Sequence, residues 1–420
     1  MIAHLQYGTT GLDLDLTGLN ATVLAPQFLD GLPDEAAAFT TAVRAPIGTR
    51  PLREQIAATD RVAVVIPDGT RPLPSDRLLP WLFAELAHVP RENFTILIGT
   101  GTHRPNTPAE LDAMLGPAVA RGYRVVNHSA TDAAGLASAG HSPLGYEVRL
   151  ARDYVAADRR IILGFIEPHF VAGFSGGYKA VFPGLAALDA IMHYHSAEVI
   201  GDPRSTWGEL EDNPTQRHVR AGGSLLPVDF CINVTLNARR QITCYFCGDT
   251  KTAHRAGCAF VKTTAMVACP RAFPIVVTTN SGFPLDQSLY QTVKGMAAAS
   301  RIVTPGGLIL TAARCNDGFP AHGNFRKLIE ESRSPQELLD RIRAPGFSML
   351  DQWQAQYLAM VLLKARVALY SELPDADVRR AHLIPVRDLR AALDAELARL
   401  GRDAPIAVLP EGPFTIPYLA

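Results

Sequence analysis

The chain has 420 residues, of which 47% are hydrophobic and 19% charged, so a disordered protein is excluded and a single core is not expected. Its 40 basic and 41 acidic side chains nearly cancel and form no long blocks, which gives no reason to expect a nucleic-acid partner. We therefore expect two domains and a small-molecule ligand.

The sequence has no pattern that is typical of secretion or of a membrane span. The first residues lack a basic stretch followed by an apolar one, and no uncharged apolar run is long enough to cross a bilayer. We expect a cytoplasmic protein without a membrane partner. The six cysteines are sparse and uneven, which favours reduced thiols. Cys244 and Cys247 have C-x-x-C spacing, but no second pair follows, so buried thiols are a better interpretation than a zinc site.

Three segments of the N-terminal half repeat one order of strand, polar loop and helix. Residues 62–66, 94–98 and 161–166 are short apolar runs, typical of buried strands. A capping-box pattern at Thr107 and Glu110 predicts that a helix begins there. The repetition predicts a largely parallel, Rossmann-like sheet in a doubly wound α/β domain. Ligands of such sheets bind at the carboxyl ends of the strands, so the three loops should converge in one cleft.

Strand and helix patterns continue through the C-terminal half. The expected elements are strands at 274–279, 307–311 and 406–409 and helices at 287–299, 325–333, 351–364 and 386–400. We predict an N-terminal α/β domain over residues 1–270 and a C-terminal α/β domain over residues 271–385. The sequence leaves open whether residues 386–420 return to the first domain.

The predicted loops carry side chains that are able to do chemistry. Asp68 and Arg71 follow the first apolar run, His103 follows the second, and His169 and Lys179 follow the third. Two histidines at strand ends favour proton transfer, because imidazole titrates near neutral pH, although each is also compatible with a structural role. A lysine beside a Gly-Gly turn is either a surface ammonium or a nucleophile with a lowered pKa.

The turn at Ser175, Gly176 and Gly177 is compatible with backbone contacts to a phosphate at a helix N-terminus. It matches neither the dinucleotide nor the P-loop fingerprint, so simple chain reversal remains the alternative. Gln291 and Lys294 are three residues apart on a predicted helix, where they either hold a carboxylate together or form a solvated face.

His195 is a candidate metal ligand at the end of the same region. His193 lies two residues earlier, so on a helix the two imidazoles point to different sides and do not bind one metal ion together. A single histidine is weak evidence for a metal site, and the role of His193 stays open.

Five motifs in order resemble those of the nickel-pincer-nucleotide-dependent lactate racemase family, whose members racemise or epimerise 2-hydroxy acids. They extend over nearly the whole chain. The motifs are Asp68-Gly-Thr-Arg-Pro72, Gly101-Thr-His103-Arg104, Glu167 to Lys179 with Pro183-Gly184 and His195, Tyr290-Gln291-x-x-Lys294, and Asp351-Gln-Trp353. The resemblance implies two α/β domains with the active site in the inter-domain cleft.

The resemblance also implies a cofactor and a role for each candidate residue. The cofactor is nickel held by a pyridinium bisthiocarboxylic acid mononucleotide, tethered at Lys179, with His195 as the protein ligand of the metal. His103 and His169 correspond to the acid/base pair, one for each enantiomer. The implied substrate-binding residues are Arg71, Tyr290, Gln291, Lys294 and Trp353. The remaining nucleotide contacts are assigned to Asp68, Thr70, Ser175, Gly176 and Gly177.

The implied substrate is a small, lactate-like 2-hydroxy acid, and the implied partners are the proteins that make the cofactor and insert nickel. The sequence leaves a homodimer open. Two alternatives belong to other classes. One is a cofactor-free α/β protein that binds a small anion through the same loops. The other is a nicotinamide-dependent 2-hydroxyacid dehydrogenase, which the absence of the glycine fingerprint disfavours.

Overall fold

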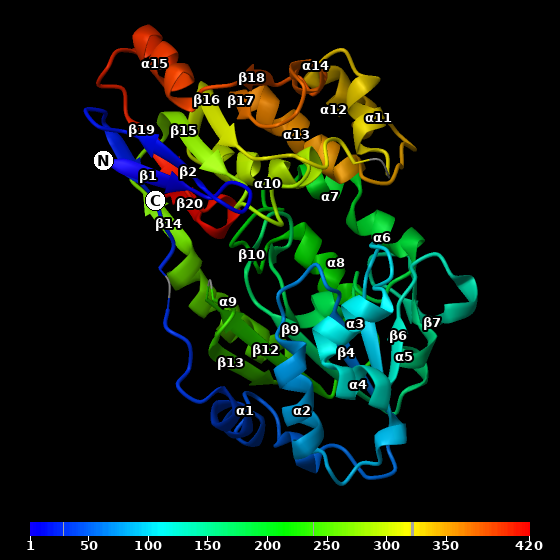
Figure 1. Ribbon diagram of the computed structural model, residues 1–420. Coiled ribbons are helices and arrows are strands. Elements are labelled where there is room, and N and C mark those ends of the chain that lie inside the picture. The colour runs from blue at the N-terminus through cyan, green and yellow to red at the C-terminus, as the bar shows by residue number, and fades with distance from the viewer. Residues whose placement is uncertain (28, 238, 321–322) are drawn as a thin grey trace. The chain divides into compact units, whose positions relative to one another are not determined.

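The computed structural model describes residues 1–420 apart from residues 28, 238 and 321–322 (Figure 1). The chain forms two compact units, each assembled from separate stretches of sequence. Unit 1 contains Met1–Gln27, His195–Pro203 and Ala265–Ala420, and unit 2 contains Phe28–Tyr194 and Arg204–Thr264. Each unit is α/β and holds a six-stranded sheet, which confirms the predicted fold class.

Unit 2 is organised around a sheet with the strand order β13-β12-β9-β4-β5-β6. The strands are β4 (Val62–Pro67), β5 (Phe94–Gly99), β6 (Arg124–Asn127), β9 (Arg159–Phe165), β12 (Phe230–Leu236) and β13 (Ile242–Gly248). All neighbours are parallel except β12 and β13, which are antiparallel. The three strands predicted from apolar runs, β9, β4 and β5, are therefore adjacent, and their C-terminal ends lie at the same edge.

Both faces of this sheet are buried, as expected for strands that are apolar on both sides. Val64 packs into one core with Leu78 of α2 (Ser75–Glu85). Val65, which points to the opposite face, packs into a second core with Ile191 of α6 (Leu188–Tyr194). The other helices of this part of the chain are α1 (Glu35–Arg44), α3 (Pro108–Leu115), α4 (Pro117–Gly122), α5 (Arg152–Ala156), α8 (Pro214–Gly223) and α9 (Thr250–Ala265).

Short elements complete unit 2. Two antiparallel pairs are β7 (Leu136–His141) with β8 (Glu147–Ala151), and β10 (Pro168–His169) with β11 (Gly173–Phe174). The 3₁₀ helices are η1 (Leu52–Glu54), η2 (Arg91–Asn93), η3 (Ala133–Gly135) and η4 (Gly177–Ala180). Helix α3 begins at the predicted capping box, in which the Thr107 N–H donates to the Glu110 carboxylate at 2.7 Å and the Glu110 N–H donates to the Thr107 hydroxyl at 3.3 Å.

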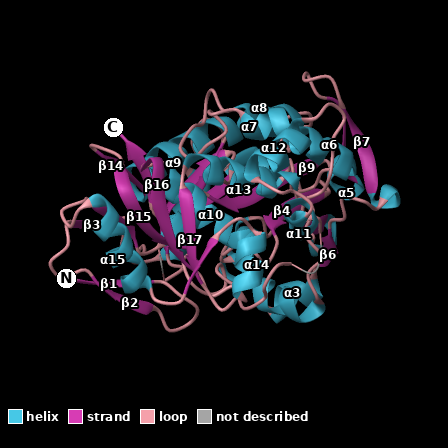
Figure 2. Cartoon of the chain, turned by 90° about the horizontal axis from the view of Figure 1, so that it is seen from above, coloured by secondary structure: helices cyan, strands magenta, loops and turns pink. Residues whose placement is uncertain are grey.

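Unit 1 holds an entirely parallel sheet with the strand order β18-β17-β16-β15-β19-β3. Its strands are β3 (Ala21–Val23), β15 (Phe273–Thr279), β16 (Val303–Ala312), β17 (Arg366–Tyr370), β18 (Ile384–Val386) and β19 (Ile406–Leu409), and Figure 2 shows β15, β16 and β17 side by side. Two small sheets are β1 (Ile2–Leu5) with β2 (Leu12–Asp15), antiparallel, and β14 (Met266–Cys269) with β20 (Ile416–Leu419), parallel. The helices are α7 (Ala197–Gly201), α10 (Leu289–Ser300), α11 (Phe325–Glu330), α12 (Pro335–Arg343), α13 (Gln352–Lys364), α14 (Asp375–Arg380), α15 (Leu389–Leu400) and η5 (Gly412–Phe414).

The division into units differs from the expected boundaries for Met1–Gln27 and for His195–Pro203, and it assigns residues 386–420, which the sequence left open. The first 27 residues, which we expected in the N-terminal domain, belong to unit 1, because β3 pairs with β19 and Leu14 of β2 packs in the core with Val277. Residues 386–420 also belong to unit 1, where Leu393 of α15 joins that same core. The expected boundary near residue 270 lies close to the change of unit after Thr264.

The cysteines are all free thiols, and five of the six are buried. Within the described part of the chain, none of the helices combines the length and the apolar composition needed to cross a membrane.

Candidate active site

Loops after three strands of unit 2 contact one another at the C-terminal edge of the sheet. Asp68 directly follows β4, and His103 lies in the loop after β5, where its Nδ1 atom is 2.7 Å from the Asp68 Oδ2 atom. The Gly101 N–H of the same loop donates to the Gly184 carbonyl at 2.9 Å, and Gly184 lies in the loop that follows η4. These contacts join the loop after β4 to the loop after β5, and the loop after β5 to the segment around Gly184.

Asp68 is a buried carboxylate, with 3% of its surface exposed. The Thr70 hydroxyl donates to its Oδ1 atom at 2.6 Å. Burial alone would raise the pKa of Asp68, but the hydrogen bond and charge of His103, helped by Thr70 and Arg71, hold it below the usual value. An ionised carboxylate only accepts hydrogen bonds, so the Nδ1 atom of His103 carries a proton. The Nε2 lone pair of neutral His103 is therefore available to accept a proton.

His169 has the opposite arrangement of its ring nitrogens. It ends the short strand β10, and its Nδ1 atom accepts hydrogen bonds from the N–H groups of Val171 at 3.3 Å and Ala172 at 3.1 Å. The ring also packs against that of Phe170, with centroids 5.1 Å apart. Because Nδ1 accepts, the proton of neutral His169 is on Nε2. The neutral tautomers of the two imidazoles therefore carry the ring proton on different nitrogens, Nδ1 in His103 and Nε2 in His169.

The Ser175 hydroxyl is used inside the fold. It donates to the Phe165 carbonyl at 2.9 Å and accepts from the Glu167 N–H at 2.9 Å. These bonds fix the start of the turn to the end of β9. Ser175 therefore shapes the turn, and its hydroxyl is already engaged by two backbone groups.

The two glycines that follow are required by the shape of the turn. Gly176 and Gly177 have φ of +80° and +56°, a region that favours glycine. The Gly177 N–H donates to the Asn233 side-chain oxygen at 3.1 Å. A Cβ atom on Gly177 would lie 2.7 Å from the ring of His254, whose Nε2 atom donates to the Ser175 carbonyl at 2.8 Å. The turn therefore packs closely against the buried polar side chains of Asn233 and His254.

Sequence reasoning did not identify Asn233 and His254. Asn233 lies in β12 and His254 in α9, and both are almost fully buried. Burial lowers the pKa of His254 to about 4, so this imidazole is neutral. Asn233 is a polar residue in an apolar strand, whereas His254 lies among polar residues at the start of α9, and neither pattern reveals a partner in a distant segment.

Lys179 follows the turn and is partly buried on η4. Its backbone N–H donates to the Gly176 carbonyl at 3.2 Å. The chain then turns tightly at Gly184, where a Cβ atom would lie 2.1 Å from the Ala180 carbonyl. The backbone around Lys179 is thus constrained on both sides.

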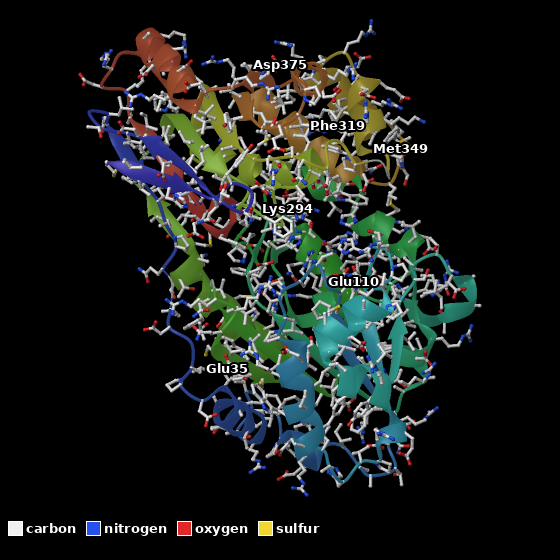
Figure 3. The ribbon with its side chains drawn as sticks, viewed as in Figure 1. Glu35, Glu110, Lys294, Phe319, Met349 and Asp375 are labelled. Carbon is white, nitrogen blue, oxygen red and sulfur yellow. The ribbon has the colours of Figure 1, made fainter. Side chains whose placement is uncertain are left out.

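The other candidate residues belong to unit 1. On α10, the Lys294 Nζ atom donates to the Gln291 side-chain oxygen at 2.6 Å, and Figure 3 labels Lys294 on this helix. The ring of His195 stacks on Trp353, with centroids 4.1 Å apart and 19° between the planes. The Trp353 indole N–H donates to the Tyr290 hydroxyl at 3.2 Å. The structure therefore joins His195, Trp353 and Tyr290 in one group and Gln291 and Lys294 in a pair.

No cluster of three or more His, Cys, Asp or Glu side chains suited to a metal ion exists among the residues that the structure describes.

His193 is exposed on α6, and its ring stacks on Tyr146, with centroids 4.3 Å apart. The Tyr146 hydroxyl is hydrogen-bonded to the Nδ1 atom of His218 at 2.8 Å. His193 thus belongs to a separate aromatic group in unit 2, whereas His195 belongs to unit 1.

Comparison with known proteins matches both parts of the chain to one family. Residues 7–208 match the lactate racemase N-terminal domain, and residues 270–416 match the lactate racemase C-terminal domain. The chain is 35% identical over 375 residues to the lactate racemase of Thermoanaerobacterium thermosaccharolyticum, covering 88% of each. It is 36% identical over 371 residues to that of Lactiplantibacillus plantarum, covering 87% of each.

Solved structures agree with these matches. The lactate racemase apoprotein of T. thermosaccharolyticum superposes with a TM-score of 0.92 at 32% identity, covering 99% of this chain and 100% of that one. A Thermotoga maritima protein superposes with a TM-score of 0.71 at 19% identity, covering 94% and 100%, and shows a shared fold.

Proposed function

The chain belongs to the lactate racemase family, and from this premise we propose that it racemises lactate or a closely similar 2-hydroxy acid. The family assignment makes it an isomerase and implies a nickel-dependent enzyme. It also replaces the two alternatives that the sequence left open, the anion-binding protein and the nicotinamide dehydrogenase.

The observation that carries the proposal is the opposite protonation of His103 and His169. Racemising a 2-hydroxy acid requires a base for the hydroxyl proton and a donor near the oxygen. Asp68 leaves the His103 Nε2 atom free of a proton and stabilises the imidazolium that forms when it accepts one. We propose that His169 presents its Nε2–H group to that oxygen.

The reverse reaction needs His169 to become the base. Its Nε2 atom accepts a proton only when the ring proton moves to Nδ1, which ends the bonds from Val171 and Ala172. We propose that the His169 ring turns away from these N–H groups when the second enantiomer is bound. Each histidine then serves one enantiomer.

The proposed cofactor is a nickel-pincer nucleotide, which supplies the acceptor and donor of the substrate hydride when it is bound. Lys179 would hold it covalently and His195 would provide the protein ligand of nickel. The residues present fit this group, since Lys179 follows a rigid turn and the His195 imidazole is fixed by Trp353. Imidazole is a suitable nickel ligand.

The proposed substrate contacts are electrostatic. Lys294, which donates to Gln291, would attract the substrate carboxylate through its positive charge, and Arg71 would do so through its guanidinium. We propose that Asp68 and Thr70 hold His103 in place of contacting the nucleotide directly. Gly176, Ser175 and Gly177 shape the turn before Lys179. The proteins that make the cofactor and load nickel are the proposed partners.

The test uses protein co-expressed with the cofactor-synthesis proteins. Chiral chromatography follows each enantiomer of lactate and of other 2-hydroxy acids. His103→Ala and His169→Ala should each abolish racemisation and leave the nickel content unchanged, whereas His195→Ala should lower it. His141→Ala, an exposed histidine at the end of β7, is the matched control. Equal loss of nickel in the first three variants would contradict the proposed roles.

A further inference from the structure

His195 is held by the start of α13. The Gln352 side chain donates to the His195 carbonyl at 3.3 Å, and the Gln356 side chain donates to the Ala197 carbonyl at 2.8 Å. Trp353, which follows Gln352 on α13, stacks on the His195 ring. The backbone of His195 and the plane of its imidazole are therefore both set by this one helix.

Trp353 is in turn oriented by Tyr290. The indole N–H donates to the Tyr290 hydroxyl at 3.2 Å. Burial raises the pKa of this hydroxyl, and the negative charge of Asp351 adds to the shift. The Tyr290 ring packs edge-on against Phe325, with centroids 5.2 Å apart and 78° between the planes. Its carbonyl accepts a bond from the Gln354 side chain. Both the ring and the backbone of Tyr290 are thus fixed independently of its hydroxyl.

Asp351 is anchored as well. It precedes α13 with φ of +69°, and its Oδ2 atom accepts from the Asn324 N–H at 3.0 Å. A Cβ atom on Gly323 would lie 1.9 Å from that oxygen, so only glycine fits beside it. The carboxylate therefore occupies a closely fitted position.

The direction of the bond between Trp353 and Tyr290 is fixed by chemistry. An indole N–H only donates, so the Tyr290 hydroxyl is the acceptor. The indole ring is therefore held by this bond on one side and by its stacking on His195 on the other.

We propose that Tyr290 is a positioning residue for His195, which acts by holding the Trp353 indole, through its hydroxyl, against the His195 imidazole. This inference rests on the proposed function, in which His195 binds nickel. It gives Tyr290 a role that differs from the expected one as a wall of the substrate pocket. Groups that orient a metal ligand commonly change metal affinity or activity 10- to 100-fold when they are lost.

The decisive variant is Tyr290→Phe, which removes only the hydroxyl and keeps the ring against Phe325. Its matched control is Tyr245→Phe in unit 2, where the hydroxyl donates to the Glu35 carbonyl at 3.1 Å. Circular dichroism and thermal melts establish that both variants fold. The two changes are chemically identical. An effect on His195 that is found only in Tyr290→Phe therefore comes from the location of the Tyr290 hydroxyl and not from the loss of a tyrosine hydroxyl in general.

The first measurement uses cofactor-free protein. Labelling with ¹³Cε1-histidine gives one signal for each of the 12 histidines, and His195→Gln identifies the signal of His195. We expect Tyr290→Phe to shift or broaden that signal and Tyr245→Phe to leave it unchanged. An unshifted His195 signal in Tyr290→Phe would overturn the inference.

The second measurement is the nickel content of protein co-expressed with the cofactor-synthesis proteins. Tyr290→Phe should lower nickel retention about 10-fold or more during dialysis against a chelator. Trp353→Phe should have a similar effect, and the double variant should be no worse, because the two residues act in series. Additive losses would overturn the inference, whereas full nickel retention in His195→Gln would overturn the proposed function instead.

Discussion

The Nδ1 atom of His103 lies 2.7 Å from Oδ2 of Asp68, a carboxylate with 3% of its surface exposed. This pairing leaves Nε2 of His103 as the proton acceptor. An asparagine at position 68 would be able to turn its amide N–H toward Nδ1, which would place the ring proton on Nε2 and remove the base.

We therefore predict that Asp68→Asn lowers kcat roughly 10²- to 10⁴-fold, the range that acid-base groups contribute. Steady-state racemisation assays that start from each enantiomer would measure the decrease in kcat. Asp158→Asn is the control, because Asp158 pairs with Arg61 before β9, at the opposite edge of the sheet. A rate close to that of the wild type would show that His103 does not depend on Asp68.

Because His254 is buried in its neutral form, the free energy of unfolding should decrease in mild acid. Burial lowers its pKa to about 4, although the hydrogen bond to Ser175 opposes the shift. In the unfolded chain the imidazole titrates at about 6.5, so the unfolded state binds the proton first as the pH falls. Stability should decrease from about pH 6.5 to about pH 4, by at most about 3 kcal/mol.

Urea unfolding between pH 4.5 and 7.5 would measure this, with His254→Gln as the comparison. The difference between variant and wild type should shrink as the pH falls. His218, whose pKa burial and the charge of His193 lower to about 4, contributes in the same window. A double variant at His254 and His218 should therefore show a still flatter dependence, and parallel curves would refute the assignment.

Gly177→Ala should destabilise unit 2 and displace Lys179. Gly145→Ala is the matched control, because Gly145 also has positive φ, +92°, but has no atom within 4 Å of its would-be Cβ. Both variants carry about 1–2 kcal/mol of backbone strain. Only Gly177→Ala adds the clash with His254, which should cost about 1–3 kcal/mol more.

Hydrogen exchange of unit 2 would compare the two variants, and peptide masses would measure the fraction of Lys179 that carries the proposed cofactor. We expect a lower modified fraction in Gly177→Ala alone. Equal stability in the two variants would mean that the turn adapts to the added methyl group.

Lys294→Gln should raise KM with a smaller change in kcat, because the proposed contact of its charge with the substrate carboxylate would act before and during the reaction. Loss of a charged hydrogen bond of about 1.5–3 kcal/mol corresponds to roughly 10- to 150-fold. Lys262→Gln, an exposed residue on α9, is the control. An unchanged KM would show that the substrate carboxylate does not bind at Lys294.

The strands that could be predicted are those with a strong local signal. Apolar, β-branched runs identified β4, β5 and β9, and the capping box identified the start of α3. Strand order at the edge of unit 1 could not be predicted, since nothing in the short segment β3 specifies β19 as its partner.

The same limit applies to the site. His103 and His169 stood out by their place after strands, but the Asp68 pairing and the Val171 and Ala172 bonds, which set the two tautomers, depend on how loops fold. His254 contacts Ser175 across 79 residues of sequence. Such contacts depend on the packing of distant elements, which periodicity does not encode.

The chain leaves unit 2 after Tyr194, contributes His195–Pro203 to unit 1 and re-enters unit 2 at Arg204. A recombination event that joined residues 7–208 of one relative to the C-terminal part of another would take His195 from one parent and Trp353 with Tyr290 from the other. Chimaeras should therefore assemble well only when His195–Pro203 comes from the same parent as Trp353 and Tyr290. The bounds of this segment are thus a practical guide for exchanging parts between racemases.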